Sequence, residues 1–289
     1  MRHKWPASIA CDVLEVSASG YFTWQRRRGC ERAGPSGRYS DEALLAHMRA
    51  IHTEVKGEYG WPRMHKELLA RGIRVGKERV RRLMQQHGIK ARTKRKFVVT
   101  TDSRHHLPVA PDLVQRQFNP DAPNQIWTGD ITYLATDEGW VYLAGVIDLH
   151  SRQLIGWSMQ PHMQTSLVRD ALAMAWFRRR PPAGTIFHSD RGSQYCSHEF
   201  QDSLKAWGMR SSMSRKGNCW DNSPTESFWS RLKTASVHGR KFATRRECMD
   251  AVLSWMAFYN HSRLHSSLGY LSPMQFEQRW HEAQHKKAA

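Results

Sequence analysis

Residues 125–160 contain three consecutive segments rich in Ile, Val, Trp, Tyr and Thr, at 125–135, 140–149 and 153–160. These residue types favour strands, and a turn-like Asp-Glu-Gly at 137–139 predicts that the segments form an antiparallel meander. Beyond them, helical patterns alternate with short apolar runs as far as Lys233. An antiparallel meander followed by alternating helices and strands predicts a mixed α/β sheet flanked by helices.

The residues upstream of this sheet, 40–90, predict three helices. Apolar residues recur at helical spacing, and the expected buried positions are Leu44, Met48, Ile51, Val55, Met64, Leu68, Val80, Leu83, Met84 and His87. The third helix turns Lys77 and Arg81 towards solvent, and five more Lys or Arg residues follow between 90 and 96. A three-helix unit with a basic last helix is typical of a helix-turn-helix DNA-binding domain. A helical bundle with solvated charges is the alternative.

Changes in pattern along the chain predict five parts. Four prolines and few periodic signals between 97 and 123 indicate an extended linker. The predicted parts are a short N-terminal helical segment with its linker at 1–39, the three-helix domain at 40–96, the linker at 97–123, the mixed-sheet core at 124–238, and C-terminal helices that pack on the core at 239–289.

The formal net charge is +18, and it divides unevenly, with +12 in residues 1–121 and +6 in the remainder. Such an excess favours an acidic partner such as nucleic acid, although a protein that is merely basic is the alternative. Five scattered cysteines without a CxxC pair predict a reduced, intracellular protein. The sequence has no apolar run of about 18 residues and no signal-peptide core, so we expect a cytoplasmic, nucleoid-associated location.

Three carboxylates stand at unusual positions in the predicted core. Asp130 lies midway along the first strand, where Asp is disfavoured; Asp190 directly follows a short apolar run; and Glu226 lies in the first turn of a helix. Each has an ordinary alternative: a salt bridge for Asp130, a turn for Asp190, and a capping box with Ser223 for Glu226. Together, on successive elements of one sheet, they indicate a site for a hard cation such as Mg²⁺ or Mn²⁺.

Four sequence blocks resemble the signature blocks of DDE transposases. They are Trp127-x-x-Asp130-Ile131-Thr132-Tyr133, His188-Ser189-Asp190-x-Gly192-Ser193-Gln194-Tyr195, Lys216-Gly217-Asn218-Cys219-x-Asp221-Asn222 with Glu226-Ser227-Phe228, and Tyr259-Asn260-x-x-Arg263-x-His265. More narrowly, the chain resembles the second-frame (OrfB) proteins of two-frame bacterial insertion sequences, which are relatives of retroviral integrases. The 35 residues between Asp190 and Glu226 match the family's spacing. Gly129, where Thr or Val is usual, and Ser223, where Ala is usual, depart from the pattern.

The resemblance implies an RNase H-like integrase catalytic core in which Asp130, Asp190 and Glu226 bind two divalent ions, Mg²⁺ or Mn²⁺. Asp130 would bridge both ions. Two such ions can activate an attacking oxygen and stabilise a leaving oxygen, so one site can nick DNA and transfer a strand. The implied partners are double-stranded DNA of the element's terminal repeats and of the target, further copies of the chain on DNA, and an upstream-frame protein or a frameshift fusion with it. An inactive DNA-binding regulator and a purely hydrolytic RNase H-type nuclease are the alternatives.

Several basic residues are candidates for contact with DNA phosphates. Lys233 lies seven residues after Glu226, two helical turns on, and so projects from the same face with Ser230, although it could be an ordinary solvated lysine. The other candidates are Arg191, Arg215, Lys216, Arg263 and His265 in the core, and Lys77 and Arg81 in the three-helix domain. Tyr195, Trp220 and Trp229 are expected to pack in the core rather than to stack on bases.

Overall fold

The computed structural model describes residues 7–28, 39–92, 107–215 and 219–288. The chain divides into two compact units, Met1–Ala91 and Arg92–Ala289, and each is described separately. Within the described residues, no helix is both long and apolar enough to cross a membrane.

The first unit is helical. Its helices are α1 (Ala7–Val13), α2 (Ala18–Arg28), α3 (Asp41–Glu54), α4 (Trp61–Ala70) and α5 (Lys77–Gln86). The Ser40 hydroxyl caps α3 by accepting the Ala43 N–H at 3.1 Å, as its position before an apolar-periodic run predicts. Of the predicted core positions in α3 to α5 and their ends, only His87 is exposed; it terminates α5, and Ile89 is buried instead. The three predicted helices at 40–90 are thus confirmed.

The second unit is built on one five-stranded sheet of order β3-β2-β1-β4-β5. The strands are β1 (Ile126–Thr136), β2 (Gly139–Asp148), β3 (Leu154–Gln160), β4 (Ile186–Ser189) and β5 (Arg210–Met213). The first three pair antiparallel, as the predicted meander requires, while β4 joins β1 and β5 joins β4 in parallel. This is the mixed sheet of the RNase H-like fold that the resemblance implied.

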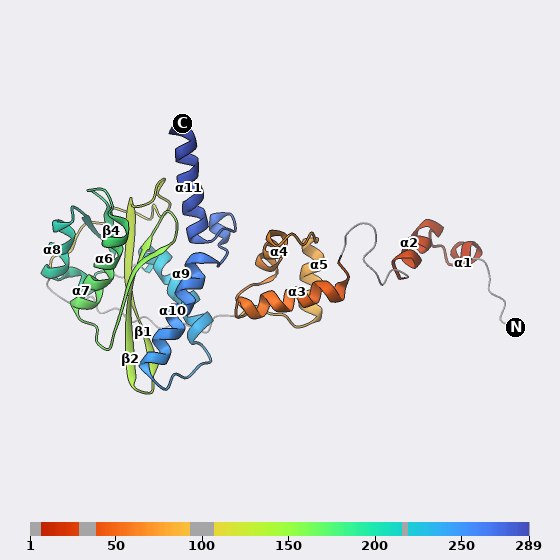
Figure 1. Ribbon diagram of the computed structural model, residues 1–289, viewed down its shortest axis with the longest axis horizontal. Helices are drawn as coiled ribbons and strands as arrows, with labels where there is room; N and C mark the ends of the chain where they lie inside the picture. Colours follow the sequence, from red (N-terminus) through yellow and green to blue (C-terminus); the bar gives the residue numbers. More distant parts are fainter. Residues whose placement is uncertain (1–6, 29–38, 93–106, 216–218, 289) are drawn as a thin grey trace. The chain divides into compact units, whose positions relative to one another are not determined.

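Helices cover both faces of the sheet (Figure 1). Helices α6 (Thr165–Arg179), α7 (Ser193–Cys196) and α8 (His198–Ala206) build one hydrophobic core with Trp127, Val146 and Phe187. On the other face, α9 (Ser223–Leu232) and α10 (Arg245–His261) build a second core with Leu134 and Leu143. A π-helical turn, η2 (Lys233–Val237), continues α9, and α11 (Pro273–Ala288) ends the described chain. The sheet is therefore buried on both faces and its carboxylate-bearing strand lies at its centre.

Part of the predicted linker belongs to the core. Residues 93–106 lie outside the described residues, but the segment from residue 107 packs on the second unit. Val114 is buried, and the Leu113 N–H donates to the Ser212 hydroxyl at 2.9 Å. The hydrogen bond to β5 and the burial of Val114 therefore fix this part of the predicted linker on the core.

Gly156 in β3 lets α6 approach the sheet closely. A Cβ atom at this position would lie 2.2 Å from the backbone oxygen of Ala171 and 2.8 Å from the Cβ of Ala175. Gly156→Ala is therefore expected to lower the free energy of unfolding by about 1–3 kcal/mol, because the helix must move away from the strand. Denaturant titration measures the change; an unaltered midpoint would show that α6 moves at no cost.

Candidate active site

The sheet brings Asp130 and Asp190 to neighbouring positions. In the parallel pair of β1 and β4, Thr128 is level with His188, so Asp130 is level with Asp190, two residues further along each chain segment. Asp190 directly follows the last residue of β4, as the sequence predicted. Because side chains alternate along a strand, the Asp130 carboxylate emerges on the same side of β1 as Thr128.

A pocket of about 410 Å³ contains both carboxylates in its lining. Aromatic residues of the β1–β2 hairpin, Tyr133, Trp140 and Tyr142, form another part of its wall, and the start of α7 with Met163 forms the remainder. The volume is within the range of small-molecule and cofactor sites. Two acids in the lining of a largely apolar pocket are a typical arrangement of a catalytic or binding site.

Two hydrogen bonds hold the Asp130 carboxylate. Its Oδ1 accepts the Ile131 N–H at 2.8 Å, and its Oδ2 accepts the indole N–H of Trp229 at 3.0 Å. Burial raises the pKa of Asp130 well above its usual value, and the negative charges of Asp190 and Glu226 raise it further. Three carboxylates that repel one another in this way are stabilised by a cation. The salt bridge proposed as the alternative for Asp130 is therefore not what holds it.

Glu226 lies in the first turn of α9, but not in a capping box. Asn222 is the N-terminal cap, so Glu226 is one position too far along the helix for that role. The Asn222 side chain does not cap either, because its Oδ1 accepts the Thr128 hydroxyl at 3.0 Å. The reciprocal capping box does form at Ser272, whose Oγ accepts the Gln275 N–H while its own N–H donates to Gln275 Oε1.

The three acids are close enough to interact electrostatically, but Glu226 does not line the pocket that Asp130 and Asp190 share. In the part of the chain that the structure describes, no three His, Cys, Asp or Glu side chains are grouped closely enough to hold a metal ion. The structure thus brings Asp130 and Asp190 together and leaves Glu226 at the edge of the site.

Lys233 is not an ordinary solvated lysine. It follows α9 directly, its side chain is half-buried, and its ammonium group lies 5.3 Å from the centroid of the Tyr133 ring. Burial lowers the pKa of Lys233, and the charge of Asp130 partly opposes this. Its charge therefore lies next to Tyr133 and interacts with Asp130.

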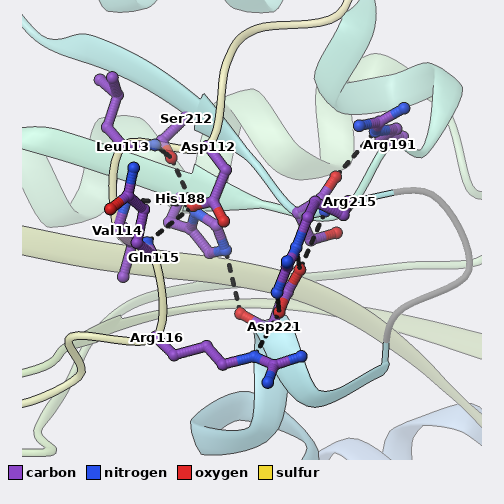
Figure 2. Close-up of polar contacts among 11 residues, drawn as sticks. Asp112, Leu113, Val114, Gln115, Arg116, His188, Arg191, Ser212, Arg215 and Asp221 are labelled. Atoms are coloured by element: carbon purple, nitrogen blue, oxygen red, sulfur yellow. Dashed lines mark hydrogen bonds and ion pairs between the residues drawn. The ribbon is translucent and has the colours of Figure 1, made fainter.

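A buried carboxylate outside the three acids organises the loop before α9 (Figure 2). The Asp221 side chain is 1% exposed and accepts hydrogen bonds from two guanidinium groups, Arg215 with Nε at 2.9 Å and Arg116 with Nε at 2.9 Å. The hydrogen bond from Arg215 lowers the pKa of Asp221 most, so this carboxylate stays ionised. The network joins the segment at 107–123 to the turn that begins α9.

The same loop is tied to β4 through a buried histidine (Figure 2). His188 Nε2 lies 3.0 Å from the Asp221 carbonyl oxygen, and Nδ1 lies 2.9 Å from the Ser212 hydroxyl. Burial lowers the pKa of His188, so the ring is neutral, with Nε2–H donating to the carbonyl and Nδ1 accepting from the hydroxyl. His188 is two residues before Asp190, and Asp221 is five before Glu226, so the network links the two chain segments that carry these acids.

The other predicted DNA contacts occupy different environments. Arg215 is half-exposed but bound to Asp221, Arg191 donates to the Ser214 carbonyl at 2.7 Å, and Lys216 lies outside the described residues. Arg263 is 2% exposed, and its contact with DNA stays a prediction. His265 packs edge-on against Tyr259, with ring centroids 4.8 Å apart.

In the first unit, Lys77 and Arg81 are exposed on α5, as predicted. Arg81 forms a surface ion pair with Glu78, whereas Arg79 and Arg82 bond to Asp41 at the start of α3. Surface pairs of this kind contribute at most about 1 kcal/mol, so they leave Arg81 available to an anion.

Several residues that support the segments carrying the acids were not predicted from the sequence. Asp221 belonged to a quoted sequence block without receiving a role, and Arg116 received none, since only the folded chain brings it within 2.9 Å of Asp221. Tyr195 and Trp229 are buried and pack in the two cores, as expected, but Trp229 also bonds to Asp130. The Trp220 side chain lies outside the described part. The glycine at position 129, where Thr or Val is usual, is explained by packing, because the Phe187 ring fills the space that a side chain at 129 would occupy.

Comparisons with known proteins agree with this geometry. An HTH-like domain model matches residues 40–97, and two integrase core domain models match residues 120–219 and 207–273. The insertion element IS600 uncharacterized 31 kDa protein of Shigella sonnei is 42% identical over 273 residues, 94% of this chain and 98% of that protein. Transposase InsF for insertion sequence IS3A of Escherichia coli (strain K12) is 44% identical over 280 residues, 96% of each chain.

Two solved structures are also similar. A simian T-cell lymphotropic virus intasome chain has a TM-score of 0.47 and 16% identity, over 80% of this chain and 74% of that one. The HTLV-2 integrase catalytic core domain in complex with magnesium has a TM-score of 0.44 and 16% identity, over 55% of this chain and 99% of that one. The matched family models, and identity above 40% over nearly the whole length of the relatives, show that this chain belongs to the family of insertion-sequence transposases with an integrase core.

Proposed function

We propose that this protein is a DDE-type DNA transposase that nicks DNA at the ends of its insertion sequence and transfers the strand to a target. The observation that carries the proposal is the pair Asp130 and Asp190 in one pocket, with the charge of Glu226 acting on Asp130. Membership of the insertion-sequence transposase family supports the choice of DNA as substrate.

The donor set suits a hard divalent ion. Asp130, Asp190 and Glu226 offer only carboxylate oxygens, which Mg²⁺ and Mn²⁺ prefer, and their mutual repulsion is relieved by positive charge. We assign the metal ligands to Asp130 and Asp190, which share one pocket, and to Glu226, which would have to move closer to complete the set. When bound, divalent ions would polarise the scissile phosphate and stabilise the charge that develops on the attacking and leaving oxygens.

The chain's own residues then have distinct tasks. Asp130 is held by the Ile131 N–H and the Trp229 indole, so its carboxylate has a fixed orientation in the pocket. Water attacking one phosphodiester forms a new bond from its oxygen to phosphorus and breaks the bond from phosphorus to the 3′ oxygen, which leaves a 3′-hydroxyl and a 5′-phosphate. That hydroxyl attacks a target phosphate in the same way, with one P–O bond formed as another breaks. Lys233, half-buried next to Tyr133, would bind a phosphate of the DNA end.

The first unit would bind DNA by itself. Lys77 and Arg81 lie on the exposed side of α5. We take α5 as the counterpart of the recognition helix, which enters the major groove in helix-turn-helix proteins. Binding is expected to weaken with salt, with log K falling by about 0.9 per phosphate contact for each unit of log salt. Lys77→Ala is expected to reduce this slope by about 1. An unchanged slope would remove Lys77 from the interface.

The experiment that tests the function uses the full chain, Mn²⁺ or Mg²⁺, and a duplex of the element's terminal repeat. We expect a nick at the repeat boundary and, with target DNA, a joined product. Hydrolysis without joining would favour an RNase H-type nuclease, and specific binding without cutting would favour a DNA-binding regulator; either result overturns the proposal.

A further inference from the structure

The pocket at Asp130 and Asp190 has an aromatic wall that the chemistry of the acids does not use. Tyr133 pairs with Tyr142 across the β1–β2 hairpin, and Ala135 pairs with Trp140, so the three rings project from the same face of the hairpin. Tyr133 meets Trp140 edge to face at 4.9 Å between centroids and Tyr142 at 6.4 Å. All three line the pocket that contains the carboxylates.

These rings remain open to solvent, unlike the other aromatic residues near the acids. Trp140 is 47% exposed, and Tyr133 and Tyr142 are half-buried, whereas Tyr195 and Trp229 are 2% and 5% exposed. The buried rings are held by the two cores. The hairpin rings therefore present apolar surface inside the pocket that Asp130 and Asp190 also line.

The charged groups near the aromatic wall favour one kind of ligand. The Lys233 ammonium group lies 5.3 Å from the centroid of the Tyr133 ring and interacts electrostatically with Asp130, so a cation lies near both the aromatic wall and one of the acids. An occupant that is aromatic at one end and anionic at the other fits this set of groups. A nucleotide has that form, with a base that stacks on aromatic rings and a phosphate that binds an ammonium group.

A base can stack on these rings only if it is no longer stacked between its neighbours in the duplex. Inside a duplex the faces of each base are covered by its neighbours, and only the edges are open to protein. We propose that the wall formed by Tyr133, Trp140 and Tyr142 binds an unpaired base of the DNA next to the scissile phosphate, so that this enzyme opens the end of the duplex during cutting. This inference rests on the proposed function, since it takes the phosphate at Asp130 and Asp190 to be the one cut.

The test compares the affinity for two terminal-repeat duplexes, one fully paired and one with a mismatch that unpairs the nucleotide beside the scissile phosphate. Both are measured without divalent metal, so that neither is cut. Because stacking of one base on an aromatic ring contributes a factor of roughly 5 to 150 in affinity, the wild-type chain should prefer the unpaired duplex by up to that factor. Trp140→Ala should lose most of the preference, and Trp140→Phe should keep most of it.

A matched control and a second measurement separate stacking from folding. Phe177→Ala removes another exposed ring, 60% exposed on α6, and should retain the wild-type preference. In the wild-type chain, 5-iododeoxyuridine at the unpaired position should photocrosslink to Trp140, Tyr142 or Tyr133. Equal preference in wild type and Trp140→Ala, or a crosslink only to residues outside the wall, would show that the rings merely stabilise the hairpin. If the wild-type chain neither binds nor nicks the repeat, the proposed function fails instead.

Discussion

Replacement of Asp190 by asparagine is expected to slow DNA nicking at least about a thousandfold, equivalent to about 4 kcal/mol of transition-state stabilisation. Asparagine removes the charge of Asp190 but can keep its hydrogen bond. Asp190 Oδ1 accepts the Gly192 N–H at 2.9 Å, and an amide oxygen can accept the same bond. The turn after β4 is therefore preserved while the negative charge is lost. The rate is measured on the terminal-repeat duplex in the presence of Mn²⁺.

DNA affinity should stay unchanged or rise slightly in the Asp190→Asn variant, because the substitution removes a negative charge from a surface that faces phosphates. Thermal stability should not fall, since Asp190 and Asp130 repel each other in the folded protein. Asp202→Asn, at an exposed carboxylate on α8, is the control and should nick at the wild-type rate. Loss of DNA binding or of folding in Asp190→Asn would instead assign Asp190 a structural role.

The second large effect is expected at Asp221. Asp221→Asn should lower the free energy of unfolding by about 2–4 kcal/mol, because a buried carboxylate loses its charge-assisted hydrogen bonds with Arg116 and Arg215. Nicking should also slow, by about 10- to 100-fold, because the loop that begins α9 is no longer fixed to β4. Denaturant titration and the nicking rate measure the two effects.

The Asp221 ion pairs should also make the stability of the fold depend on pH. The pKa of Asp221 is lowered in the folded protein, so its ionised form contributes fully to stability above the usual carboxylate pKa of about 4, and this contribution declines as the pH falls from there to the lowered pKa. The Asp221→Asn variant should show less acid destabilisation than the wild type. Asp250→Asn breaks an exposed pair with Arg246 and should change stability by less than about 1 kcal/mol. Equal effects at the two positions would contradict a special role for Asp221.

The arrangement of elements was predictable because it depends on local patterns. The period of apolar residues predicted α3 to α5, and strand-forming residues interrupted by a turn predicted β1 to β3. His87 was misplaced because the helical pattern runs on for one residue after α5 has ended. The position of Asp190 at the end of β4 followed from a short apolar run alone.

The support around the acids was not predictable, because it depends on contacts between distant segments. Arg116 meets Asp221 across 105 positions, and Trp229 meets Asp130 across 99. The aromatic wall needs the register of the hairpin, which places Tyr133 opposite Tyr142 and Trp140 on the same face. The capping-box alternative for Glu226 likewise failed on a shift of one residue in the start of α9, which sequence patterns do not resolve.

In the proposed reaction, Asp130, Asp190 and Glu226 form one site that first cuts a phosphodiester at the element's end and then joins the new 3′-hydroxyl to a target phosphate. This reaction is tested most directly by a strand-transfer assay with a labelled terminal-repeat duplex, a plasmid target and Mn²⁺. We expect a covalently joined product for the wild-type chain and none for Asp130→Asn, Asp190→Asn or Glu226→Gln. A joined product from any of these three variants at the wild-type rate would contradict it.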